Sequence, residues 1–341
     1  MSLEFIDGFD HYNNTTNLGR KWDTDSHANF TGGRFGGNAV ADIGASNSKI
    51  ALTQGQLSAV VTRVMGFAYR ASSLSYTGPV WTFMDASSEQ CSLRLSTNTL
   101  TFNRGSTVLG TSPTVLVTGT WYYIEVKATI GSAGAFEVRV DGVTKISGTG
   151  NTQSTGNTST NGIQLSVGDF SGFSYTIDDV YILNSSGSTN NTFLGDCRVL
   201  TTLPNADNTS SPSTNLTWTP NSGTTHYTQV DDTPSPDDDT TYVSSATPGQ
   251  IDTYKFPAIS PTGPIAGIQA VLTARKDDAA ARTISAEYRS SGGTNFDGSS
   301  VFSLTTSYLM DRQIWETDPA TSTAWTAAGV NGGEFGEKCI S

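Results

Sequence analysis

Apolar side chains occupy every second position of two consecutive segments, 124–130 and 136–140, and this alternation most constrains the fold. A period of two places successive side chains on opposite faces, which is typical of a β-strand with one buried face. The dipeptide Asp141-Gly142 follows the second segment and tolerates the positive φ angles of a tight turn. We therefore predict two strands here, with a hairpin turn at 141–142.

The same pattern recurs along the chain. A second hairpin is predicted between 93 and 102, around Thr97-Asn98, and further strands at 252–256, 268–274 and 284–289. The 35 glycines and the long Ser, Thr and Asn tracts also favour turns and strands over helices. A short helix is predicted only at 319–330, so the fold class is all-β.

A stretch rich in Asn, Ser, Thr and Pro divides the chain. The 341 residues suggest two domains, since a domain usually holds about 100–200 residues. The residues between 205 and 220 include little that could form a core. We predict a first domain at 1–204, a linker at 205–220 and a C-terminal β domain at 221–341.

Charge, cysteine content and hydropathy exclude several classes of protein. The net charge of -12 predicts a surface that repels nucleic acid and anionic membranes. Three scattered cysteines indicate neither a disulfide framework nor a CxxC metal site. The acidic N-terminus predicts no signal peptide, and the most apolar windows, 57–71 and 264–274, are too short to cross a membrane. We expect a protein made in a cytoplasm.

The order of several short motifs carries a resemblance to a known family. The first domain resembles the concanavalin A-like, laminin-G-like jelly rolls of tailed-bacteriophage proteins. The matching segments are Phe5-Ile6-Asp7-Gly8-Phe9-Asp10-His11-Tyr12 with Trp22, Gly119-Thr120-Trp121-Tyr122-Tyr123-Ile124-Glu125, Phe136-Glu137-Val138-Arg139-Val140-Asp141-Gly142, Ile177-Asp178-Asp179-Val180-Tyr181 and Phe193-Leu194-Gly195-Asp196. The second domain is similar to the C-terminal part of the same class, through Asp237-Asp238-Asp239-Thr240-Thr241-Tyr242-Val243, Asp318-Pro319, Ala324-Trp325-Thr326 and Glu334-Phe335-Gly336.

The resemblance implies a concanavalin A-like jelly-roll sandwich followed by a smaller β-sandwich-like domain with one short helix. It also implies a structural or accessory protein of a phage virion, which we expect to be non-enzymatic and to belong to the neck or collar, the tail or the capsid exterior. Its partners are then other virion proteins and further copies of itself, a trimer being one arrangement. The alternative is a glycan-binding adhesin that recognises sugars of the host surface.

The residues do not indicate an enzyme. Jelly-roll glycosidases place paired carboxylates as Glu-x-Asp-x-x-Glu on one strand, a pattern that the chain lacks. The strand period assigns Glu125 and Glu137 to a polar, solvated face. His11, His27 and His226 are expected as turn or strand-end residues, and the segment 32–37, which lacks the Lys-Ser/Thr of a phosphate loop, is expected as a turn.

Two sets of residues are candidates for ligand contacts. No cofactor is expected, but Ca²⁺ could bind an acidic loop formed by Asp231, Asp232, Asp237, Asp238 and Asp239, whose alternative role is an exposed acidic turn. Candidate glycan contacts are Trp81, Tyr76 and Tyr69, because aromatic faces stack on sugar rings, whereas Trp22, Trp121 and Tyr123 are expected in the core. The pair Asp178-Asp179 is expected to tie neighbouring backbone, with a metal site as the alternative.

Overall fold

Two compact units, Met1–Leu200 and Thr201–Ser341, make up the chain. The computed structural model describes residues 2–26, 28–42, 48–52, 55–75, 77–168, 175–208 and 215–341. Strands dominate both units, so the prediction of an all-β chain is confirmed.

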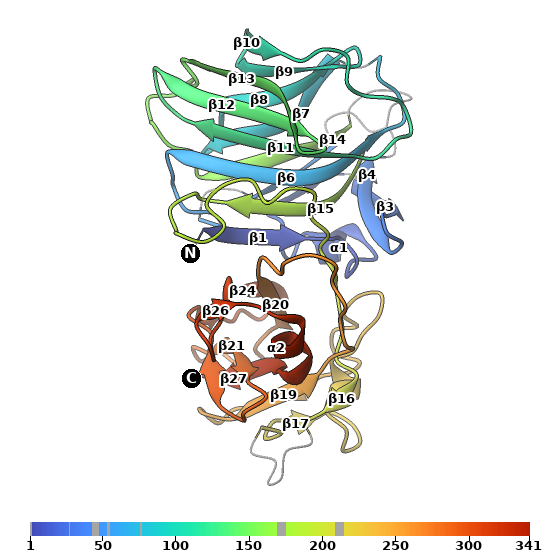
Figure 1. The fold of residues 1–341 in the computed structure, drawn as a ribbon. Coiled ribbons are helices and arrows are strands. Elements are labelled where there is room, and N and C mark those ends of the chain that lie inside the picture. The colour runs from blue at the N-terminus through green and yellow to red at the C-terminus, as the bar shows by residue number, and fades with distance from the viewer. Residues whose placement is uncertain are drawn as a thin grey trace. The chain divides into compact units, whose positions relative to one another are not determined.

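The first unit is a sandwich of two antiparallel sheets, as the jelly-roll resemblance implies. Figure 1 shows β12, β11, β6, β15 and β1 side by side in the larger sheet. This sheet comprises β1 (Leu3–Asp7), β3 (Ala28–Gly32), β4 (Asn38–Asp42), β6 (Thr62–Ala71), β11 (Tyr122–Thr129), β12 (Gly134–Val140), β13 (Val143–Gly150) and β15 (Tyr175–Leu183). The second sheet comprises β2 (Thr24–Ser26), β5 (Ser48–Leu52), β7 (Thr77–Asp85), β8 (Ser88–Ser96), β9 (Thr99–Arg104), β10 (Thr107–Thr111) and β14 (Gly162–Gly168).

The predicted hairpins explain the local order of the strands. Asp141 and Gly142 have φ angles of 49° and 75° and join β12 to β13. Thr97 and Asn98 have φ angles of 43° and 45° and join β8 to β9. Both turns are therefore confirmed, because consecutive residues with positive φ match the right-handed twist of the flanking strands.

Aromatic and branched side chains from the two sheets form the core of the first unit. Phe102 of β9 stacks on Phe136 of β12 with ring centroids 4.6 Å apart. Trp22 and Tyr123, which were expected in the core, are buried. The third, Trp121, is half-buried beneath the guanidinium of Arg70. Near the N-terminus a single turn of helix, α1 (Thr15–Leu18), is capped by the Asn14 side chain.

The second unit is built on a smaller antiparallel sheet. It comprises β16 (Ala206–Asp207), β19 (Ile251–Lys255), β21 (Thr283–Arg289), β22 (Asn295–Asp297), β23 (Phe302–Ser303) and β27 (Glu334–Cys339). Three strand pairs accompany it: β17 (Thr219–Pro220) with β18 (Val243–Ser244), β20 (Ile268–Ala274) with β24 (Leu309–Trp315), and β25 (Thr317–Asp318) with β26 (Thr323–Ala324). Tyr288, Trp315, Trp325 and Phe335 form its aromatic core.

The helix predicted at 319–330 is shorter and begins later than expected. α2 (Ala327–Gly332) starts where the Thr326 side chain accepts a hydrogen bond from the Gly329 N–H. The residues before it form β25 and β26 instead. A further short 3₁₀ turn, η1 (Tyr227–Gln229), is the remaining helical element of this unit within the described residues.

Most of the segment expected as a linker contributes to the second unit. β16 pairs with β19, Leu216 bridges to Asp252, and β17 pairs with β18. The described residues of 205–220 are thus held by ladder hydrogen bonds. Composition alone cannot reveal this pairing because short edge strands need few apolar residues.

Candidate functional site

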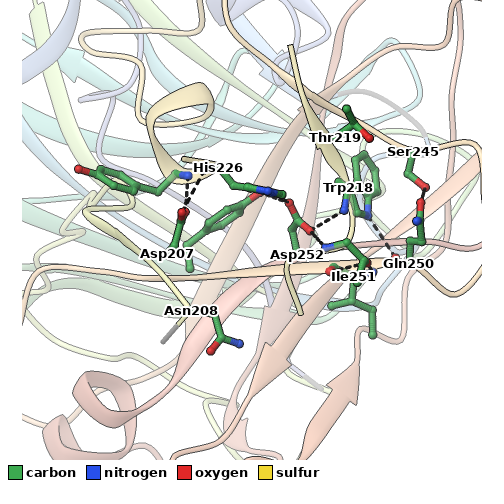
Figure 2. A network of polar contacts seen from close by, with 12 residues as sticks. Asp207, Asn208, Trp218, Thr219, His226, Ser245, Gln250, Ile251 and Asp252 are labelled. Atoms are coloured by element: carbon green, nitrogen blue, oxygen red, sulfur yellow. Dashed lines mark hydrogen bonds and ion pairs between the residues drawn. The ribbon is translucent and has the colours of Figure 1, made fainter. Parts of the chain in front are cut away.

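A network of polar contacts in the second unit centres on Asp252 of β19 (Figure 2). Its Oδ1 accepts hydrogen bonds from the backbone N–H groups of Thr217 and Trp218, at 2.6 and 2.8 Å. Its Oδ2 lies 2.6 Å from Nδ1 of His226. This buried carboxylate therefore ties two separate stretches of chain to β19.

The surrounding contacts extend the same anchoring role. Asp207 of β16 accepts hydrogen bonds from the N–H groups of His226 and Tyr227, where η1 begins. The indole N–H of Trp218 donates to the carbonyl of Gln250 at 3.1 Å. Within the described residues, the His226 ring is hydrogen-bonded to Asp252 and the His226 N–H donates to Asp207. No hydrogen bond there joins the His226 side chain to a serine, threonine or cysteine.

Burial raises the pKa of carboxyl groups in and beside this network. Burial raises the pKa of Asp252, although the Trp218 N–H and His226 oppose the shift. Tyr254 donates to Oε1 of Glu337 at 2.6 Å, and burial raises the pKa of Glu337 to about 8. A histidine acts as a catalytic base only when a nucleophile or substrate proton lies within its reach. The hydrogen bonds of His226 position the 226–229 turn instead.

In the first unit, residues 193–199 form a strap that is bonded to β11 and β15. The Gly195 N–H donates to Oε1 of Glu125 at 2.8 Å, and the Leu194 N–H donates to the Tyr181 hydroxyl at 3.2 Å. Tyr181 in turn donates to Glu125 at 2.5 Å. Glu125 is 1% exposed, so its expected place on a solvated face is wrong. Glu137, by contrast, remains partly exposed and accepts hydrogen bonds from Arg139 and Thr144.

The pair Asp178-Asp179 ties backbone together, as the sequence predicts. Oδ2 of Asp178 accepts from the Arg34 N–H, and Oδ1 of Asp179 accepts from the Val199 N–H, both at 2.8 Å. Burial, with repulsion from Asp179, raises the pKa of Asp178 to about 7, and burial raises that of Asp179 to about 6. The two carboxyls thus fasten the 33–37 turn and the strap to β15.

The 33–37 turn also presents an aromatic side chain that was not among the candidate contacts predicted from the sequence. Phe35 is 51% exposed, and the guanidinium groups of Arg34 and Arg198 each lie 4.9 Å from the centre of its ring. Arg34 is held by two hydrogen bonds of 2.5 Å to Asp196 of the strap. The signal in the sequence is the pair Arg34-Phe35 with two glycines on each side. Glycines favour a tight turn, and a tight turn exposes the side chains at its tip.

Two of the three predicted glycan contacts lie away from the surface. Trp81 is fully buried on β7, and Tyr69 is 1% exposed on β6. A ring buried in this way has no face to offer to a sugar. Tyr76 and His27 lie outside the described residues.

The acidic loop is organised by hydrogen bonds within the protein. Asp232 accepts from the Asp237 N–H and the Thr241 hydroxyl, and Asp239 binds Arg275 and Tyr308. Asp231 and Asp238 lie in the same loop. In the part of the chain that the structure describes, no group of three or more Asp, Glu, His or Cys residues is arranged to hold a metal ion.

The structure also bears on the cysteines and on the helices. The thiols of Cys91, Cys197 and Cys339 are free. None of the described helices has the length and apolar character needed to cross a membrane.

Comparisons with known proteins give only distant structural likeness. No protein-family model matches the chain, and no curated protein matches it in sequence. An endo-β-1,4-glucuronan lyase from the fungus Trichoderma reesei is 14% identical, with a TM-score of 0.40, over 53% of this chain and 95% of the lyase. Domain 4 of an extracellular arabinanase from Geobacillus stearothermophilus is 18% identical, with a TM-score of 0.37, over 53% of this chain and 92% of that domain.

A third likeness is to the receptor-binding domain of botulinum neurotoxin type G. It is 14% identical, with a TM-score of 0.34, over 48% of this chain and 42% of the neurotoxin domain. Likeness at this level assigns no function.

Proposed function

We propose that this chain is a non-enzymatic structural or accessory protein of a tailed-phage particle, acting through protein–protein contacts. The motifs that resemble phage jelly rolls support the assignment to a phage particle. The contacts made by the carboxyl groups of these motifs support a structural role. These groups hold backbone: Asp10 accepts from the Asn38 N–H, Asp178 from the Arg34 N–H and Asp179 from the Val199 N–H.

This use of the carboxylates is the observation that carries the proposal. A hydrolase needs carboxyl groups directed at a substrate bond, with room for a sugar or a water between them. Here the same groups fix loops onto a rigid sandwich. Fixed loops on a rigid scaffold suit repeated contacts with neighbouring subunits, whose combined strength needs no deep pocket.

Labelling of intact particles tests the proposal. A gold-labelled antibody raised against residues 1–203 is expected to decorate the neck, the capsid exterior or the tail of the phage that encodes the chain. A blot of denatured particles serves as the control for a hidden epitope. Absence of the chain from both the intact particles and the blot would overturn the proposal.

A glycan-binding adhesin is the second candidate function, and the exposed Phe35 favours it. An accessible aromatic ring next to guanidinium and carboxyl groups combines apolar stacking with hydrogen bonding, which is the chemistry that sugars need. This site replaces the buried Trp81 and Tyr69 as the proposed point of contact.

The adhesin function predicts saturable binding of the full chain to host cells, competed by soluble host glycan. Phe35→Ala is expected to weaken this binding at least about tenfold, the effect of losing roughly 1.4 kcal/mol. Tyr242→Ala is the matched control, because Tyr242 is a comparably exposed aromatic residue of the second unit, 41% exposed. Equal binding by both variants would count against the adhesin function.

A further inference from the structure

Three chemically complementary side chains lie on adjacent strands of the second unit. Lys338 is on β27, Glu287 on the neighbouring β21, and Asp297 on β22 beyond it. Glu287 lies opposite Asp297 in the register, and Lys338 lies opposite Ser285, two residues before Glu287. All three therefore project from the same face of the sheet.

The amine and the carboxyl group are in direct contact. Nζ of Lys338 lies 2.7 Å from Oδ1 and 2.6 Å from Oδ2 of Asp297. The Lys338 side chain is 22% exposed and the Asp297 side chain 53% exposed, so a water molecule can leave from the contact.

Glu287 supplies an acid beside this contact. It is fully buried, and no amine, amide or hydroxyl group of the described residues donates a hydrogen bond to either of its carboxyl oxygens. Burial, followed by its hydrogen bond and repulsion with Asp297, raises the pKa of Glu287 to about 8. A pKa of about 8 leaves the Glu287 carboxyl protonated at neutral pH, opposite Asp297 in the register.

We propose that Lys338 and Asp297 form an intramolecular isopeptide bond, with Glu287 as the proton donor for the reaction. A proton first passes from Nζ of Lys338 to Asp297, which leaves a neutral amine and a neutral acid. The amine then attacks Cγ of Asp297 while Glu287 donates to the carboxyl oxygen. The C–N bond forms, the C–O bond breaks, one water molecule leaves, and the proton returns to Glu287.

Proximity is the driving force for this reaction. Amide formation from separate amines and acids is unfavourable in water, but well-oriented groups in one molecule reach effective concentrations on the order of 10⁵–10⁸ M. The bond would join the C-terminal strand β27 to β22 covalently, which suits a protein exposed on the outside of a particle.

The Lys21–Asp7 ion pair of the first unit provides an internal comparison. Nζ of Lys21 lies 3.1 Å from Oδ2 of Asp7, and both side chains are buried. Asp7, however, also accepts hydrogen bonds from Phe9, Tyr12 and Trp22. Burial raises its pKa, but Lys21, His11 and the Tyr12 and Phe9 donors together hold the pKa below its ordinary value. The hydrogen bond to Lys338 likewise lowers the pKa of Asp297, so the feature that distinguishes the Lys338–Asp297 pair is the buried Glu287 carboxyl opposite Asp297 in the register.

Intact mass spectrometry of the full-length chain tests the proposal. The wild-type mass is expected to be lower than the sequence mass by one water molecule. After digestion, one cross-linked peptide should contain both Lys338 and Asp297. Lys338→Arg keeps the positive charge but cannot form the amide, and Glu287→Gln keeps the buried shape but removes the acid, so both variants are expected to show the full mass.

The neighbouring Gly298 makes the Lys338→Arg variant essential. An Asp-Gly pair can lose water by forming a cyclic imide with its own backbone, and this reaction needs no lysine. Loss of water that persists in Lys338→Arg would overturn the proposal, as would a wild-type chain of full mass with separate Lys338 and Asp297 peptides. Loss of water that depends on both Lys338 and Glu287 would establish it.

Discussion

At the scale of single residues, buried carboxyl groups hold separate parts of this fold together. Asp7 is fully enclosed, and its oxygens receive the Tyr12 hydroxyl at 2.7 Å, the Trp22 indole N–H at 2.9 Å and the Lys21 amine at 3.1 Å. These contacts explain why an Asp precedes the aromatic residues of the N-terminal motif. The carboxylate gathers the polar ends of side chains whose rings lie in the core.

Replacing Asp7 by Asn should be strongly destabilising. Asp7→Asn leaves the Lys21 ammonium buried without its counter-charge, and breaking such a pair costs about 3–5 kcal/mol. Urea unfolding measures the change in the free energy of unfolding. The control is Asp278→Asn, which removes an exposed, solvent-screened pair with Arg282 and should leave the free energy of unfolding nearly unchanged. Similar losses in the two variants would contradict the assigned role of Asp7.

The carboxyl group of Glu337 should make stability depend on pH. Its pKa of about 8 in the folded chain exceeds the ordinary value of 4.5, so the folded state holds the proton more tightly than the unfolded state. The stabilisation is fully present below pH 4.5 and is lost as the pH rises through 8.

The Glu337→Gln variant isolates this effect because Gln mimics the neutral acid. Between acidic pH and pH above 8, wild type is expected to lose several kcal/mol of unfolding free energy relative to the variant. Urea titrations over that range provide the measurement. Parallel pH profiles for the two proteins would show that Glu337 is ionised in the folded state.

At the scale of elements, close packing of neighbouring strands selects glycine. Gly66 lies in β6 next to β15, and a Cβ at this position would lie 2.2 Å from the ring of Tyr181. The same tyrosine hydroxyl contacts Glu125 and the strap. The absence of a side chain at 66 thus leaves room for the ring that holds residues 193–199.

Gly66→Ala is therefore expected to destabilise the first unit. Forcing a methyl group into a packed site costs about 1–3 kcal/mol, and displacement of Tyr181 should also loosen the strap. Thermal unfolding and proteolysis near residue 195 report the two effects. Gly156→Ala, at an exposed position where a Cβ meets no atom within 4 Å, should change stability by less than about 1 kcal/mol.

At the scale of the whole molecule, each unit contains its own core and its own sheets. Every strand of the two large sheets lies between residues 1 and 200, and the aromatic core of the second unit lies within 201–341. Units with separate cores usually fold separately.

A fragment of residues 1–200 is accordingly expected to fold by itself. It should give the circular dichroism of a β protein and one cooperative thermal transition, matching one of two transitions in the full chain. An unfolded fragment, together with a single transition in the full chain, would show that the units fold only together.

Local sequence patterns were enough to predict several strands, two hairpin turns and the all-β class. Alternation predicted β11 and β12, and the turn residues Asp141, Gly142 and Asn98, which tolerate positive φ, predicted the two hairpins. The structural role of Asp178-Asp179 could also be predicted, since two carboxyls in a buried strand must find partners.

Which side chains meet, and which face of a strand is covered, depends on how distant segments pack together. Period 2 correctly separates the two faces of β11, but it cannot show that residues 193–199 return to bury Glu125, some 70 positions earlier in the chain. Nor can composition show that Trp81 is enclosed between the sheets while Phe35 stands exposed at a turn. Alternation is a local property of the chain, whereas burial depends on segments that approach from far along the sequence.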